Sequence, residues 1–178
     1  MSKRNNLVFT GLQIIAWIIF VGLCIEAGGL IVNFIFSLFK PESVQNLYQK
    51  LDLNQMYNTN VWVYFGLYGF ILTISILKVY LFYVVVMLLH KIDMLKPFSS
   101  YVADQIKKIS YITLEIGILS LIARETSQRM EHYGLESNKL NQFWEDGSAF
   151  LLMAAVIYVI ATIFSRGVEL QSENELTV

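Results

Sequence analysis

Four long blocks of apolar residues, separated by short polar segments, constrain this chain more than any other feature. They run from about residue 7 to 39, 61 to 89, 109 to 123 and 149 to 164. A helix rises about 1.5 Å per residue, so roughly 20 apolar residues cross the hydrocarbon core of a bilayer. The first two blocks exceed this length, and the last two reach it with flanking residues. The pattern predicts four membrane-spanning helices.

The composition agrees with a membrane protein. Only 15% of the residues are charged, whereas soluble proteins carry about a quarter. The net charge of −1 gives no basic field that would attract nucleic acid. A single cysteine, Cys24, cannot form an internal disulfide or a redox pair, and His90 and His132 lie far apart in the sequence. We therefore expect no metal, no cofactor and no direct contact with nucleic acid.

The breaks between the blocks define a single membrane domain, residues 1–178, with an all-α fold. Pro97 supplies a turn before the third block, and Ser99 or Ser100 can cap the helix that follows. The first block is too long for a cleaved signal peptide, so we expect it to remain as a helix. The predicted architecture is an integral membrane four-helix bundle with spans at about 8–38, 61–89, 105–128 and 148–165.

The basic residues orient the predicted bundle. With both termini in the cytoplasm, the loop of about 90–104 and the tail 166–178 lie inside, and the loops of about 40–60 and 129–147 lie outside. Basic residues near span ends favour the cytoplasmic side, which predicts this orientation in a multi-pass inner-membrane protein. The inner segments then hold Lys3, Arg4, Lys91, Lys96, Lys107, Lys108 and Arg166, against Lys40, Lys50, Arg129 and Lys139 outside.

Four ionisable residues fall within or at the edge of the predicted spans: Glu26, Lys78, Glu115 and Arg124. Each costs on the order of 3 kcal/mol near the centre of a bilayer unless it is paired. Counted from the inner span ends, Glu26 and Arg124 both lie near the outer surface, whereas Lys78 and Glu115 lie deeper. We therefore predict the pairs Glu26–Arg124 and Lys78–Glu115. These pairs either fix the helix register or form a proton relay, an ion relay or a buried ligand site.

Two motifs lie on the predicted cytoplasmic side, Lys96-Pro97-Phe98-Ser99 and the tail Arg166-Gly167-Val168-Glu169-Leu170-Gln171-Ser172-Glu173-Asn174-Glu175-Leu176-Thr177-Val178. With four spans, they resemble the bacterial domain-of-unknown-function family 2975, whose tail follows an ELxxENDLTV-like pattern. Glu175 stands where aspartate is common in that pattern. The family has no established activity, so the resemblance implies fold and location only. Members are often encoded beside a small helix-turn-helix regulator, which suggests a membrane partner for a transcription factor.

Two functions follow as hypotheses. The first is a regulatory or sensory module that holds a cytoplasmic DNA-binding protein through Lys96, Pro97, Phe98, Glu169, Leu170, Glu173, Glu175 and Leu176. The alternative is a small transporter or proton-coupled carrier that uses the buried charges. An unpaired acid in a wet cavity would favour the carrier, and closed ion pairs would favour the module. We expect no enzyme, because the spans hold no nucleophile–base set, no HExxH and no paired aspartates.

The sequence also bears on the order of the tail, on the lipid partner and on the oligomeric state. By composition, a bare acidic tail of this kind is solvated and disordered, unless it docks on a basic partner. The lipid bilayer is the first partner that the apolar blocks require. The sequence leaves the oligomeric state open, including a homo-oligomer.

Overall fold

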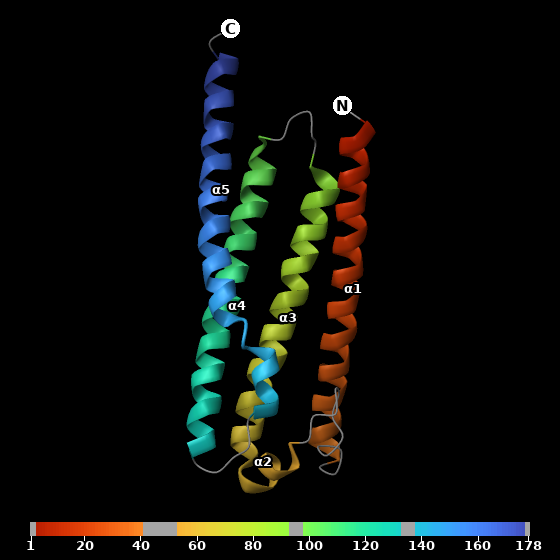
Figure 1. Ribbon diagram of the computed structural model, residues 1–178, viewed down its shortest axis with the longest axis vertical. Helices are drawn as coiled ribbons and strands as arrows, with labels where there is room; N and C mark the ends of the chain where they lie inside the picture. The colour runs from red at the N-terminus through yellow and green to blue at the C-terminus, as the bar shows by residue number, and fades with distance from the viewer. Residues whose placement is uncertain (1–2, 41–52, 93–97, 133–137, 177–178) are drawn as a thin grey trace.

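The structure is a computed structural model that describes residues 3–40, 53–92, 98–132 and 138–176. The described residues are helical almost throughout and contain no strand. Four helices are long and two are short (Figure 1). In chain order the elements are α1 (Lys3–Phe39), α2 (Asn54–Thr59), α3 (Val61–Lys91), α4 (Ser100–His132), the 3-10 helix η3 (Asn138–Phe143) and α5 (Gly147–Leu176).

Three helical segments are long and apolar enough to cross a membrane: Val8–Phe39, Val61–Lys91 and Leu140–Glu173. They contain the first, second and fourth of the predicted spans. The third predicted span lies in α4, a single helix of 33 residues, but α4 does not belong to this group. The reason is its charge. Glu115 lies in the middle of its apolar stretch, with Lys107 and Lys108 close before that stretch and Arg124 and Glu125 directly after it.

The four long helices lie in a row in the order α1, α3, α4, α5 (Figure 1). Among the described residues, extensive contacts join only neighbours in this row, together with α2 against α3 and η3 against α4. The two outer helices of the row, α1 and α5, therefore do not pack along one another. The all-helical fold is as predicted, but these contacts do not confirm a closed four-helix bundle.

Small residues allow α4 and α5 to approach closely. A Cβ atom on Gly117 of α4 would lie 2.8 Å from Leu151 Cδ2 and 3.0 Å from the Leu151 backbone nitrogen of α5. A Cβ atom on Gly147, the first residue of α5, would lie 2.8 Å from Ser120 Cβ. Glycine and serine at such positions let two helix backbones meet, which is the usual way that membrane helices pack. As a result α5 begins opposite the middle of α4.

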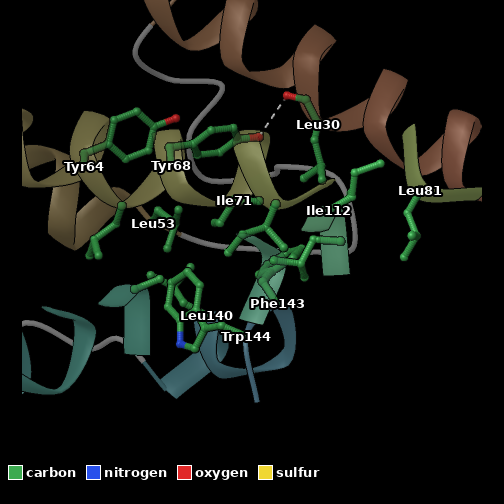
Figure 2. Close-up of a cluster of buried hydrophobic side chains, with 14 of the residues drawn as sticks. Leu30, Leu53, Tyr64, Tyr68, Ile71, Leu81, Ile112, Leu140, Phe143 and Trp144 are labelled. Carbon is green, nitrogen blue, oxygen red and sulfur yellow. Dashed lines mark hydrogen bonds between the residues drawn. The ribbon is translucent and has the colours of Figure 1, made fainter. Parts of the chain in front are cut away.

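A cluster of buried hydrophobic side chains joins α1, α2, α3, α4 and η3 along the row. There η3 and the residue after it insert Leu140, Phe143 and Trp144 against α3 and α4 (Figure 2). On the other side of α3, the Tyr68 hydroxyl donates a hydrogen bond of 3.1 Å to the Leu30 carbonyl of α1. This bond ties α1 to α3 inside an otherwise apolar cluster.

The acidic tail is helical, in contrast to the expectation of disorder. Helix α5 runs without a break from Gly147 to Leu176 and projects past the ends of its neighbours (Figure 1). An established helix lengthens easily, because the costly nucleation has already taken place inside the row. An ion pair between Arg166 Nη1 and Glu169 Oε2 at 2.7 Å supports this extension.

Candidate functional site

Helices α1 and α3 bring Glu26 and Lys78 to the same level. The side-chain amide of Gln13 in α1 donates a hydrogen bond of 2.7 Å to the Leu89 carbonyl of α3, which fixes the register of this antiparallel pair. Glu26 follows Gln13 by 13 residues, and Lys78 precedes Leu89 by 11 residues. With equal rise along both helices, the two charged residues lie nearly opposite each other.

Both charged side chains line one small cavity. Its volume is about 30 Å³, enough for roughly one water molecule. Polar groups and an aromatic ring share its wall, so an acid and a base surround a polar space near the middle of two apolar helices. The lining residues are Leu23 and Glu26 from α1, Ser75 and Lys78 from α3, and Gln142 and Phe143 from η3.

Lys78 has a second neighbour on α5. Its ammonium nitrogen lies 5.6 Å from the centroid of the Phe150 ring, within the range of a cation–π interaction. Lys78 and Glu26 are both only partly buried. Lys78 therefore connects the cavity to the first turn of α5, and the cavity residues include charges of both signs.

The other two predicted intramembrane charges lie elsewhere. Arg124 is exposed on α4, directly after the fully buried Ala123. Glu115 is also exposed, on the face of α4 that carries Tyr111 and Ile118. Neither predicted pair, Glu26–Arg124 or Lys78–Glu115, is among the ion pairs of the described residues.

The two sequence motifs meet at the end of the molecule that carries the termini. The Phe98 ring lies 5.2 Å from the Phe164 ring, centroid to centroid, and occupies the space that a Cβ atom on Gly167 would need. The Ser99 hydroxyl accepts a hydrogen bond of 3.3 Å from the Val102 backbone N–H, which confirms the predicted cap of α4. The first motif thus starts α4 and also packs against α5.

The predicted partner-binding residues are spread along this end. Phe98 and Leu170 are exposed, Glu169 pairs with Arg166, and Glu173 is exposed on the helical extension. Lys96 and Pro97 lie outside the described residues. Glu175 and Leu176 belong to α5, but their side chains are not described.

A family model described as a protein of unknown function, DUF2975, matches residues 48–178. The chain belongs to this family. The DUF2975 match covers α2 to α5 and contains both motifs, whereas α1 with Glu26 precedes it. No curated protein and no solved structure matches the chain.

Two residues that line the cavity, Ser75 and Gln142, were not among the site residues predicted from the sequence. Ser75 lies within the predicted span of about 61–89 and Gln142 within the predicted loop of about 129–147, and neither residue type points to a site by itself. Within the residues that the structure describes, no group of three or more His, Cys, Asp or Glu side chains could hold a metal ion. The cavity is thus built from one acid, one base and neutral polar groups.

Proposed function

We propose that this DUF2975 protein is a membrane-bound regulatory module whose projecting α5 extension binds a basic cytoplasmic protein, such as a small helix-turn-helix regulator. One observation carries the proposal. The family tail is helical as far as Leu176 and continues α5 beyond the row (Figure 1), and Leu170, Ser172 and Glu173 on it are exposed. A rigid helix that leaves a membrane domain is a suitable docking element, because little conformational entropy is lost when a partner binds it.

The chemistry of the extension supports a basic partner. Leu170 is 61% exposed and provides an apolar anchor outside the apolar block of α5. Glu169, Glu173 and Glu175 outnumber the single base Arg166 along the same segment. Complementary charge speeds association with a DNA-binding protein and selects against acidic partners.

The orientation in this proposal follows the basic residues. Helix α1 begins and α5 ends at the same end of the row (Figure 1). Lys91 is the last residue of α3, Lys107 lies about two turns into α4, and Arg166 lies in the second half of α5, which puts all three towards that end. Basic residues at span ends favour the cytoplasm, which would place the α5 extension there, in the cell membrane. The proposal includes no catalytic step.

Site-specific photo-crosslinking in cells would test it. A photoreactive residue replaces Leu170 in one variant and Ile163 in the other. Both side chains are 61% exposed and lie seven residues apart on one face of α5, but only Ile163 is within the apolar block. We expect a small basic protein with a helix-turn-helix to crosslink at position 170 and not at position 163.

Either of two crosslinking results would contradict the proposed docking role of the α5 extension. If position 170 crosslinks only lipid, or crosslinks the same species as position 163 when both variants are fully expressed, the extension is not a docking element. A positive crosslink should also weaken when Glu169 and Glu173 are replaced by glutamine, because complementary charge then falls.

The Glu26–Lys78 cavity favours a second candidate, a proton-coupled carrier. An acid and a base around a space for one water could pass a proton between the two ends of the row. Proton flux into vesicles that hold the purified chain would then be lost in Glu26→Gln and kept in Glu125→Gln, an exposed acid of α4. Equal flux in both variants and in empty vesicles would exclude the carrier.

A further inference from the structure

A groove follows the contact between α4 and α5 and changes character along its length. The groove consists of two adjoining clefts that share Tyr158, one nearer the middle of the row and one nearer the chain termini. Both lie against small residues of α5, which leave room beside α4. Neither cleft includes a residue of the Glu26–Lys78 cavity.

The part of the groove nearer the middle of the row is apolar. Its volume is about 360 Å³, within the range of small-ligand sites. It lies beside the apolar block of α5, at a depth where hydrocarbon surrounds the helices. The residues that line it are Ser110, Tyr111, Leu114, Leu151, Ala154, Ala155 and Tyr158.

The part nearer the chain termini is polar and basic. Its volume is about 230 Å³, and its wall carries Lys107 from α4 and Arg166 from α5, with a net positive charge despite Glu169. Glu169 Oε2 pairs with Arg166 Nη1 at 2.7 Å, so these two charges offset each other and Lys107 supplies the net positive charge of the wall. The other N–H groups of the Arg166 guanidinium are further donors for an anion. The remaining lining residues are Tyr158, Ala161, Thr162 and Ser165.

We propose that this groove binds an anionic phospholipid of the leaflet on the side of the chain termini. The lipid phosphate lies between Lys107 and Arg166, and an acyl chain lies along Ala155 and Tyr111. Charge complementarity selects this occupant. A free anion would leave the apolar part empty, and an uncharged lipid would leave the basic part without a partner.

The position of each base along its helix fits this ligand. Arg166 lies just beyond the apolar block, at the level of a lipid headgroup. Lys107 is exposed just before the apolar stretch of α4, and its long stem can carry the ammonium group to the same level. Leu170 lines neither cleft, but it follows Arg166 by about one helical turn, so the headgroup site and the proposed docking surface are neighbours on α5.

Native mass spectrometry on the full chain in detergent would test the proposal. Phosphatidylglycerol, phosphatidylethanolamine and phosphatidylcholine with identical acyl chains are added one at a time, and the fraction of protein that carries one lipid is measured. We expect phosphatidylglycerol to be retained best. Lys107→Gln and Arg166→Gln should each weaken its retention about tenfold, the scale of one lost charge-assisted contact.

Two control substitutions separate the groove from the general surface. Lys91→Gln removes an exposed base at the same end but outside the groove, and should leave retention unchanged. Ala155→Trp fills the apolar part and should reduce retention, whereas Val156→Trp, on the opposite face of α5, should not.

Four outcomes would overturn the proposal. The first is equal retention of phosphatidylcholine and phosphatidylglycerol, and the second is the same loss in Lys91→Gln as in Lys107→Gln. The third is displacement of the lipid by millimolar inorganic phosphate, which would identify a site for a free anion. The fourth is a preference for phosphatidylethanolamine that disappears in Glu169→Gln, which would identify a zwitterionic headgroup.

Discussion

An ionisable side chain within an apolar helix has to find a polar environment, and Glu26 and Lys78 share one. The Gln13–Leu89 hydrogen bond sets the register of α1 on α3 and thereby brings the acid and the base to one cavity. Arg124, the partner predicted for Glu26, lies on α4, which is not the neighbour of α1 in the row. The cost of each charge is lowered by the other charge, by polar side chains and by space for a water.

A double-mutant cycle would measure this arrangement. We expect Glu26→Gln and Lys78→Gln to be coupled by about 0.5–3 kcal/mol in the free energy of unfolding, measured in mixed micelles, because both groups line the same cavity. The cycle of Glu26→Gln with Arg124→Gln should show coupling below about 0.5 kcal/mol. The reverse ranking would favour the Glu26–Arg124 pair predicted from the sequence.

At the scale of elements, α4 is the most polar of the long helices and yet lies inside the row. It is held there by close packing rather than by hydropathy. Among the described residues its contact with α5 is the most extensive, and a Cβ atom on Gly117 or on Gly147 would lie 2.8 Å from a side-chain atom of the facing helix. Dispersion forces and tight packing stabilise membrane helix pairs in this way, since lipid gives no hydrophobic advantage to association.

The packing at Gly117 leads to a stability prediction. Gly117→Ala places a Cβ atom against the Leu151 side chain and backbone, so we expect the free energy of unfolding to fall by about 1–3 kcal/mol. Gly22→Ala is the matched control, because nothing lies within 4 Å of its Cβ position. Thermal unfolding in detergent would compare the two. Equal effects would show that helix propensity, and not the α4–α5 contact, determines the result.

At the scale of the whole molecule, the open row separates three surfaces. The cavity lies between α1, α3 and η3, the groove lies between α4 and α5, and the extension leaves the row with α5. The hydrophobic core joins α1, α2, α3, α4 and η3 (Figure 2). A change at one surface therefore need not disturb the others, which makes separate tests of the proposals meaningful.

The orientation of the row is testable by labelling. In a Cys24→Ala background, we expect Asn58→Cys on α2 to react with an impermeant maleimide in intact cells. Ser172→Cys on the α5 extension should react only after the membrane is opened. Both positions are exposed and lie at opposite ends of the row. The reversed pattern would invert the proposed orientation, and labelling of both from outside would contradict a membrane between them.

Local properties of the sequence were sufficient to place the helices. Apolar length predicted the positions of α1, α3, α4 and α5, and Ser99 was recognised as a cap, because hydropathy and capping depend on residues close in the chain. The family was also recognisable from two short motifs. The continuation of α5 through the tail was not expected, since the tail composition by itself favours disorder.

Tertiary structure alone determined which residues meet. Depths counted along single helices led to the pairs Glu26–Arg124 and Lys78–Glu115, whereas the hydrogen bond from Gln13 to Leu89 sets the offset of α1 on α3, and Glu26 and Lys78 line one cavity. Likewise, the contact of Phe98 with Gly167 and the start of α5 opposite Ser120 depend on how helices are offset against each other. Helix composition does not determine this offset. The offset depends on where small residues allow two backbones to meet. It is therefore a property of a pair of packed helices and cannot be read from the sequence of either helix alone.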